Sequence, residues 1–276
     1  MVKFMDKKGS VSVNYKSKHP VVMGILNVTD DSFFSSSRCQ STAELLKKVD
    51  LFTNNGVSIL DVGACSTRPG ATFVSEKEEL ERLLPALEVL RNHYPDSIIS
   101  VDTFRGNVVR KVVEEFDVDI INDVFSFDKD ETMLDVVASL NRTYVLMHSG
   151  EINTGKSDFM KEIFRFFVKK IKILEDRGVK DIIIDPGYGF GKTMEQNFQL
   201  LSHQSELLQL GYPILAGLSR KRMVWQSLNV KVEEALNGTT VLNTIALQQG
   251  AHILRVHDVK EAMEAVKLWS LCQNNH

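Results

Sequence analysis

The sequence predicts an α/β protein that folds as a single (β/α)8 (TIM) barrel. Eight short apolar runs alternate with longer stretches that have helical spacing. The 276 residues show no linker and no break in composition, and barrels of this kind commonly occupy about 250 residues as one domain. Ligand-type polar residues follow the apolar runs, as expected where strand ends meet at a barrel mouth. A doubly wound open sheet is the alternative fold.

The eight apolar runs have the length and β-branched content of strands that are buried on both faces, which a parallel sheet requires. They comprise residues 21–26, 57–62, 97–102, 118–123, 143–148, 181–185, 212–217 and 251–256.

The intervening stretches carry apolar residues at helical spacing, most clearly in residues 41–55, 75–94 and 160–178. Ser75 and Glu78 have the spacing of a capping box, which predicts a helix start there. We expect residues 1–20 to form a frayed extension or a small hairpin and residues 21–276 to form the barrel domain.

Composition excludes several classes of protein. Hydrophobic residues make up 43% and charged residues 25% of a chain whose net charge is -3, so no basic surface suggests a nucleic-acid partner. The three cysteines match no disulfide or metal spacing. No apolar run approaches the roughly 18 residues of a membrane span, and the N-terminal segment lacks an apolar signal core. We therefore expect a cytoplasmic protein with reduced thiols and no membrane partner.

At the end of each predicted strand, or just after it, lie side chains that could bind a ligand. These residues are Asn27, Asp61, Asp102, Asn122 with Asp123, His148, Asp185, Ser219 with Arg220 and Lys221, and Arg255 with His257. At any one position, loop polarity explains the residue equally well. For eight strand ends in succession, convergence at one barrel mouth is the better interpretation.

The ordered motifs resemble those of dihydropteroate synthases. The first two are GILNVTDDSF (residues 24–33) and DVGACSTRPGA (residues 61–71), and SVDTFR, IINDV, LMHSG, DIIIDPGYGFGKTMEQN, PILAGLSRKRM and LRVHDV follow in the family's order. The resemblance extends over residues 21–265. It implies condensation of 6-hydroxymethyl-7,8-dihydropterin pyrophosphate with 4-aminobenzoate, which yields 7,8-dihydropteroate and pyrophosphate in folate biosynthesis.

The resemblance also implies a pterin pocket formed by Asp102, Asn122, Asp185 and Lys221, of which Asp102, Asp185 and Lys221 are the expected catalytic residues. A buried carboxylate such as Asp185 can accept two adjacent N–H donors of a pterin. Each residue has a structural alternative. Asp185 could be a turn residue before Pro-Gly, and Lys221 could be a solvated lysine.

The remaining family positions hold the pyrophosphate and the second substrate. The expected pyrophosphate residues are Asn27, Thr67, Arg68, Arg255 and His257, with Mg2+ as cofactor and Asn27 as its protein ligand. The expected 4-aminobenzoate residues are Phe33, Thr67, Arg68, Pro69 and Ser219. As structural alternatives, Arg255 could pair with a neighbouring carboxylate such as Asp258, and His257 could be an N-cap neighbour.

The chain departs from the family pattern in the loops around the second substrate. The substituted positions are Asp30, Ser35, Ser36, Ser37, Ala64, Cys65 and Arg222. Arg222 either adds a positive charge where the substrate carboxylate docks or points into solvent, and the outward orientation is slightly favoured because Lys221 must face inward.

Three other functions share parts of this pattern: a pterin-binding methyltransferase, a Schiff-base aldolase that uses Lys221, and a pterin-binding paralogue without activity. The STRP and SRK segments argue against the methyltransferase, and a turnover assay separates all of these. The resemblance further suggests a homodimer and a target for sulfonamides, which mimic 4-aminobenzoate.

Overall fold

The computed structural model describes residues 2–3, 12–13, 19–28, 38–65, 72–153 and 156–273. Its main sheet has eight strands, and every pair of neighbours for which a register is given runs parallel. The strands are β3 (Val21–Asn27), β4 (Ile59–Gly63), β5 (Ile98–Asp102), β6 (Ile120–Asp123), β7 (Thr143–Met147), β8 (Ile182–Asp185), β9 (Leu215–Ala216) and β10 (Ile253–Val256).

The sheet closes into a barrel. Its strand order is β8-β7-β6-β5-β4-β3-β10-β9, so β8 and β9 are the last strands at either end. Ile184 in β8 forms a parallel bridge with Ile214, and its N–H donates to the Pro213 carbonyl at 2.9 Å. The predicted (β/α)8 barrel is confirmed, and the open-sheet alternative is set aside.

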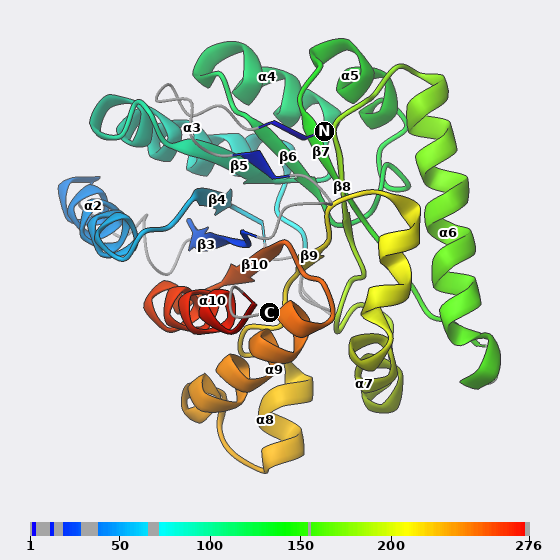
Figure 1. Ribbon diagram of the computed structural model, residues 1–276. Helices are drawn as coiled ribbons and strands as arrows, with labels where there is room; N and C mark the ends of the chain where they lie inside the picture. The colour runs from blue at the N-terminus through cyan, green and yellow to red at the C-terminus, as the bar shows by residue number, and fades with distance from the viewer. Residues whose placement is uncertain are drawn as a thin grey trace.

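Helices surround the strands, as Figure 1 shows. The α-helices are α2 (Arg38–Asn54), α3 (Glu76–His93), α4 (Gly106–Phe116), α5 (Met133–Leu140), α6 (Lys156–Asp176), α7 (Met194–Ser202), α8 (Arg222–Leu228), α9 (Leu236–Gln248) and α10 (Val259–Gln273). Two 3-10 helices, η1 (Gln204–Leu210) and η2 (Val232–Glu234), precede β9 and α9. The predicted capping box starts α3: Glu78 N donates to Ser75 Oγ at 3.2 Å, and Ser75 N donates to Glu78 Oε2 at 2.9 Å.

Seven of the eight strands are shorter than predicted, by one to four residues, and β4 and β9 show identifiable reasons. β4 begins at Ile59 rather than residue 57, because the Val57 N–H donates to the Phe52 carbonyl at 3.0 Å and closes the end of α2. β9 covers only Leu215–Ala216 of the predicted 212–217. Pro213 has no N–H to donate to a strand ladder, although its carbonyl still accepts the bond that closes the barrel.

Before the barrel, β1 (Val2–Lys3) and β2 (Ser12–Val13) pair antiparallel, with Val2 opposite Val13. No helix of the described ranges has the length and apolar character needed to cross a membrane.

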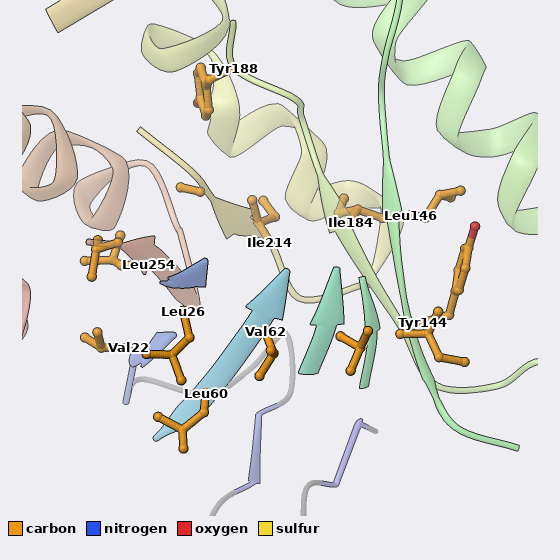
Figure 2. Close-up of a cluster of buried hydrophobic side chains, with 14 of the residues drawn as sticks. Val22, Leu26, Leu60, Val62, Tyr144, Leu146, Ile184, Tyr188, Ile214 and Leu254 are labelled. Atoms are coloured by element: carbon orange, nitrogen blue, oxygen red, sulfur yellow. The ribbon is translucent and has the colours of Figure 1, made fainter. Parts of the chain in front are cut away.

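Alternate residues of each strand face the helices and form the larger core. Figure 2 shows this layer, in which Val22 and Leu26 of β3, Leu60 and Val62 of β4, and Leu254 of β10 are buried. A side chain at Gly24 would meet the Phe52 ring at 2.6 Å, so this strand position must lack a side chain for α2 to pack against β3.

The other alternate residues fill the inside of the barrel. One buried apolar residue from each strand forms a separate cluster, which we name the lumen floor: Met23, Ile59, Ile98, Ile120, Val145, Ile183, Leu215 and Ile253. Because side chains alternate along a strand with period two, residues two and four positions later point into the lumen nearer the mouth.

Candidate active site

A buried ionic network lies above the lumen floor. The Arg255 guanidinium donates from Nε to Asp61 Oδ2 and from Nη2 to Asp102 Oδ2, both at 2.6 Å. Asp61 also accepts from Ser100 Oγ at 2.6 Å and lies 3.3 Å from Asn122 Nδ2. We name Asp61, Asp102, Asn122 and Arg255 the mouth cluster. Each of them follows a lumen-floor residue of its own strand by two or four positions, so the barrel itself brings them together.

Asp102 is the member of this cluster whose charged form is least favoured. Burial raises the pKa of its carboxyl group to about 7, even though the neighbouring Arg255 acts in the opposite direction. Its Oδ1 is buried and has no hydrogen-bond partner among the described residues. Such an acceptor costs free energy unless a ligand donates to it. The guanidinium of Arg255 stays charged, because Asp61 and Asp102 outweigh the effect of burial and raise its pKa.

Asp185 and Lys221 form a second pair at the mouth. Asp185 ends β8, is 5% exposed and accepts from Gly187 N at 2.7 Å. Burial raises the pKa of this carboxyl group, while Lys221 opposes the shift. Burial also lowers the pKa of Lys221 to about 8, and Asp185 opposes that shift. The two groups therefore lie in one poorly hydrated space and favour each other's charged forms.

Lys221 lies inside the site rather than in solvent. It is the N-cap residue of α8, its Nζ donates to the Tyr188 carbonyl, and Nζ lies 4.8 Å from the centre of the Phe190 ring. Arg222, the next residue, is exposed, and its Nε donates to Gln226 Oε1 at 2.7 Å along its own helix. The outward orientation favoured for Arg222 is the one observed.

Ser219 and His257 meet beside the mouth. Ser219 Oγ lies 3.0 Å from His257 Nδ1 and accepts from His257 N at 3.1 Å. Asp258 pairs with Arg220, whose Nε and Nη2 each donate to it at 2.9 Å. The alternative in which Asp258 pairs with Arg255 is therefore wrong, because Arg255 points into the lumen, where Asp61 and Asp102 engage its guanidinium.

Several predicted site residues lie outside the described ranges: Phe33, Thr67, Arg68 and Pro69, together with the substituted residues Asp30, Ser35, Ser36 and Ser37. Asn27 ends β3 and is exposed at the mouth. Cys65 is buried, and burial raises the pKa of its thiol.

Two arginines hold the backbone on either side of residues 66–71. Arg82 Nη1 donates to the Ala64 carbonyl at 3.1 Å, and Arg105 Nη2 donates to the Val74 carbonyl at 2.5 Å. Arg105 also pairs with the buried Glu79.

The sequence interpretation assigned no role to two residues of this region. Asp61 was recognised only as a strand-end residue, but it is the partner of Arg255. Its position two residues after Ile59, on the same strand face, was the available signal. Lys192 was not singled out, and its Nζ lies 3.0 Å from His148 Nδ1 among backbone carbonyls. No side-chain pattern in the sequence indicates that arrangement, because its other partners are backbone atoms.

Comparison with known proteins links this geometry to one family. Residues 23–257 match the family model described as pterin binding enzyme. The chain is similar to the dihydropteroate synthase of Clostridium beijerinckii, with 39% identity over 95% of this chain and 97% of that protein. It is also similar to the Escherichia coli dihydropteroate synthase, with 40% identity over 91% of this chain and 90% of that protein.

Solved structures give the same result. A dihydropteroate synthase of Clostridium difficile, crystallised with pteroic acid, superposes with a TM-score of 0.88 and 34% identity over 95% of this chain and 99% of that chain. A Xanthomonas albilineans dihydropteroate synthase with 4-aminobenzoic acid has a TM-score of 0.85 and 38% identity, and covers 92% of this chain and 93% of that chain.

Proposed function

The chain belongs to the dihydropteroate synthase family of pterin-binding enzymes, and we propose that it catalyses that family's reaction. A dihydropterin pyrophosphate and 4-aminobenzoate condense to 7,8-dihydropteroate and pyrophosphate. The observation that carries the proposal is the convergence of Asp102, Asn122, Asp185 and Lys221 at one barrel mouth, with buried acceptors that call for an N–H-rich ligand.

In this proposal the pterin ring lies between the two carboxylates. Asp185 accepts two adjacent N–H donors of the ring, which form charge-assisted hydrogen bonds in a dry site. The free Oδ1 of Asp102 offers a second acceptor. Because Asn122 turns its Nδ2 toward Asp61, its carbonyl oxygen faces away from that carboxylate and can accept from the ligand. Lys221 donates to the pterin carbonyl or a ring nitrogen.

In this proposal the pyrophosphate lies toward Arg255 and His257. The family resemblance assigns Thr67 and Arg68 to the same site, and both lie outside the described residues. The Nε and Nη2 atoms of Arg255 are engaged by carboxylates, while Nη1 has no hydrogen-bond partner in the described part of the chain. Nη1 can therefore donate to a phosphate oxygen.

Mg2+ fits this arrangement through Asn27. No group of three or more His, Cys, Asp or Glu side chains in the described ranges could hold a metal by itself. Mg2+ usually takes one or two protein ligands and completes its shell with water and substrate phosphates. Asn27 is exposed at the mouth, and its side-chain amide oxygen could supply such a ligand. When bound, the ion would neutralise negative charge on the leaving pyrophosphate.

The reaction begins with cleavage of the bond between the exocyclic methylene carbon and the pyrophosphate oxygen, whose electron pair leaves with pyrophosphate. The resulting cation is spread over the pterin, beside Asp102 and Asp185, and the ionised forms of these carboxyl groups stabilise it in a site of low polarity. The neutral arylamine nitrogen then attacks the methylene carbon and afterwards releases a proton to water. Positioning and charge stabilisation suffice, and no side-chain nucleophile takes part.

The 4-aminobenzoate lies against Phe33, Thr67, Arg68, Pro69 and Ser219. Ser219 is buried and bonded to His257, which fixes it at the edge of the pterin site. The helix that follows, α8, has only seven residues, so its dipole adds little to carboxylate binding.

A turnover assay tests the proposal. Dihydropterin pyrophosphate, 4-aminobenzoate and Mg2+ should yield dihydropteroate and one pyrophosphate per product. Pterin binding without turnover would instead support a non-catalytic paralogue, and trapping of Lys221 by borohydride with a carbonyl substrate would support an aldolase.

We also propose a homodimer in the cytoplasm. Five exposed apolar side chains lie on α8, η2, α9 and α10: Leu228, Val232, Val241, Leu268 and Leu271. Pairing of this surface between two copies would remove it from water. Cys65 and Cys272 form no disulfide with each other or with another described cysteine, which suits a reducing compartment. Light scattering coupled to size-exclusion chromatography should give twice the chain mass. Leu268→Glu should shift the measured mass toward that of the monomer.

A further inference from the structure

Lys192 is a partly buried cation beside the site, and the proposed function gives it no role. Its Nζ lies 2.9 Å from the Gly187 carbonyl oxygen and 3.2 Å from the carbonyl oxygens of His148 and Phe190. It also lies 3.0 Å from His148 Nδ1. We name this arrangement the Lys192 clamp.

The clamp joins two backbone segments that have no space for side chains between them. A Cβ at Gly187 would lie 1.9 Å from the His148 carbonyl oxygen, and one at Gly191 would lie 2.5 Å from the Gly150 carbonyl oxygen. The segment after β8 therefore packs directly on the backbone that follows β7. The carbonyl oxygens of His148 and Gly187 both face this junction and would repel each other without a shared donor.

The segment held by the clamp supplies the contacts of Lys221. The Tyr188 carbonyl accepts from Lys221 Nζ, and the Phe190 ring lies under the same ammonium. The Gly187 N–H orients Asp185 by donating to its Oδ1 at 2.7 Å. Displacement of this segment would therefore move both Asp185 and Lys221 relative to a pterin.

We propose that Lys192 is a positioning residue for pterin binding, which acts by holding the segment that orients Asp185 and Lys221. This inference rests on the proposed function and extends it. Lys192 does not itself touch the reacting atoms. Its role is to neutralise the three carbonyl dipoles so that the segment keeps one conformation.

The charges around Lys192 make this role sensitive to pH. Burial lowers its pKa to about 7, with Asp185 opposing the shift and Lys221 adding to it. Burial together with Lys192 lowers the pKa of His148 to about 3, so the imidazole stays neutral and its Nδ1 accepts from the ammonium. The lowered pKa of Lys192 means that its proton is lost as the pH rises through about 7. The neutral amine has one donor fewer and turns a lone pair toward the carbonyls, so the clamp weakens.

The test compares Lys192→Met, Lys192→Arg and the wild type, with Lys172→Met on the exposed face of α6 as the matched control. Binding of dihydropterin pyrophosphate is measured by calorimetry from pH 6 to 9, and the KM of each substrate and the Tm are measured in parallel. At pH 6.5, Lys192→Met should weaken pterin affinity about tenfold, the size of one charged hydrogen bond, and raise the pterin KM far more than the 4-aminobenzoate KM. Lys172→Met should match the wild type.

Lys192→Arg keeps its charge throughout this range. Its pterin affinity should lack the part of the decline near pH 7 that comes from Lys192, while titration of Asp102, of Lys221 and of the ligand remains common to both proteins. This comparison also decides the matter if Lys192→Met does not fold. Equal pterin affinity in Lys192→Met and wild type, equal loss for both substrates, or the same decline near pH 7 in Lys192→Arg would overturn the inference. A wild type that binds no dihydropterin pyrophosphate would instead contradict the proposed function.

Discussion

The lumen floor and the mouth cluster lie on the same strands, two to four residues apart, and differ in what they contribute. The floor contains only apolar residues, none more than 3% exposed. The mouth cluster consists of two carboxylates and an amide that are nearly as deeply buried, at most 5% exposed, and of the partly buried guanidinium of Arg255. The same strand therefore supplies a residue that stabilises the fold and, two or four positions later, a residue that can bind a ligand.

The comparison shows that the mouth buries ionisable groups whose charged forms would be better hydrated in water. Burial raises the pKa of Asp102 from its usual value near 4 to about 7. The folded protein thus holds this proton more tightly than the unfolded chain does, and the stability linked to Asp102 is lost as the pH rises from about 4 to about 7. A ligand that donates hydrogen bonds would recover part of that loss.

The largest expected effect comes from Arg255→Ala. Removal of the guanidinium leaves Asp61 and Asp102 buried without their cation, which should lower the free energy of unfolding by about 3–5 kcal/mol. Urea denaturation measures this change, and Ile253→Val, two residues earlier on the same strand face, is the control, with an expected loss of about 0.5–1.5 kcal/mol.

The same Arg255 variant should bind pyrophosphate far less tightly, with a smaller change for 4-aminobenzoate, because Nη1 is the donor left for a phosphate. Equal losses for both ligands would mean that Arg255 acts only in the fold.

A smaller effect is expected from Asn27→Ala, at the outer end of β3. Loss of one amide ligand should raise the Mg2+ concentration needed for half-maximal turnover several-fold, since water and phosphate supply most of the metal's shell. Full activity of the wild type in excess chelator would contradict a metal at this position.

The smallest effect is expected from Arg222→Ser, because Arg222 belongs neither to the lumen floor nor to the mouth cluster. The guanidinium is exposed and bonded to Gln226, so the KM for 4-aminobenzoate should stay unchanged at low and high salt. A several-fold rise in that KM that shrinks with added salt would show that Arg222 turns toward the substrate in solution.

The sequence predicted the barrel well because strand burial and helix spacing are local patterns. It also predicted which residues end the strands. It did not predict which of two adjacent strand-end residues, Asn122 or Asp123, faces the lumen. Side-chain alternation sends Asn122 into the lumen toward Asp61, while Asp123 points outward and accepts from the Tyr144 hydroxyl at 2.7 Å.

Partner identity could not be predicted in the same way. The pairing of Arg255 with Asp61 joins residues 194 positions apart and depends on closure of the barrel. The Lys192 clamp depends on backbone carbonyls, which every residue possesses. For the second-substrate residues Phe33, Thr67, Arg68 and Pro69, the roles proposed here rest on the family resemblance.

The most direct test of the account is calorimetric titration of dihydropterin pyrophosphate into Asp185→Asn and Ile183→Val. These substitutions lie on the same face of β8, one at the mouth and one in the lumen floor. In Asp185→Asn, an amide N–H donor replaces a carboxylate oxygen that the pterin N–H groups need as an acceptor. The binding free energy for the pterin should therefore weaken by about 1.5–3 kcal/mol, while the protein stays folded. Ile183→Val should lower the Tm and keep pterin affinity. Unchanged affinity in a folded Asp185→Asn variant would contradict the assignment of the barrel mouth as the pterin site.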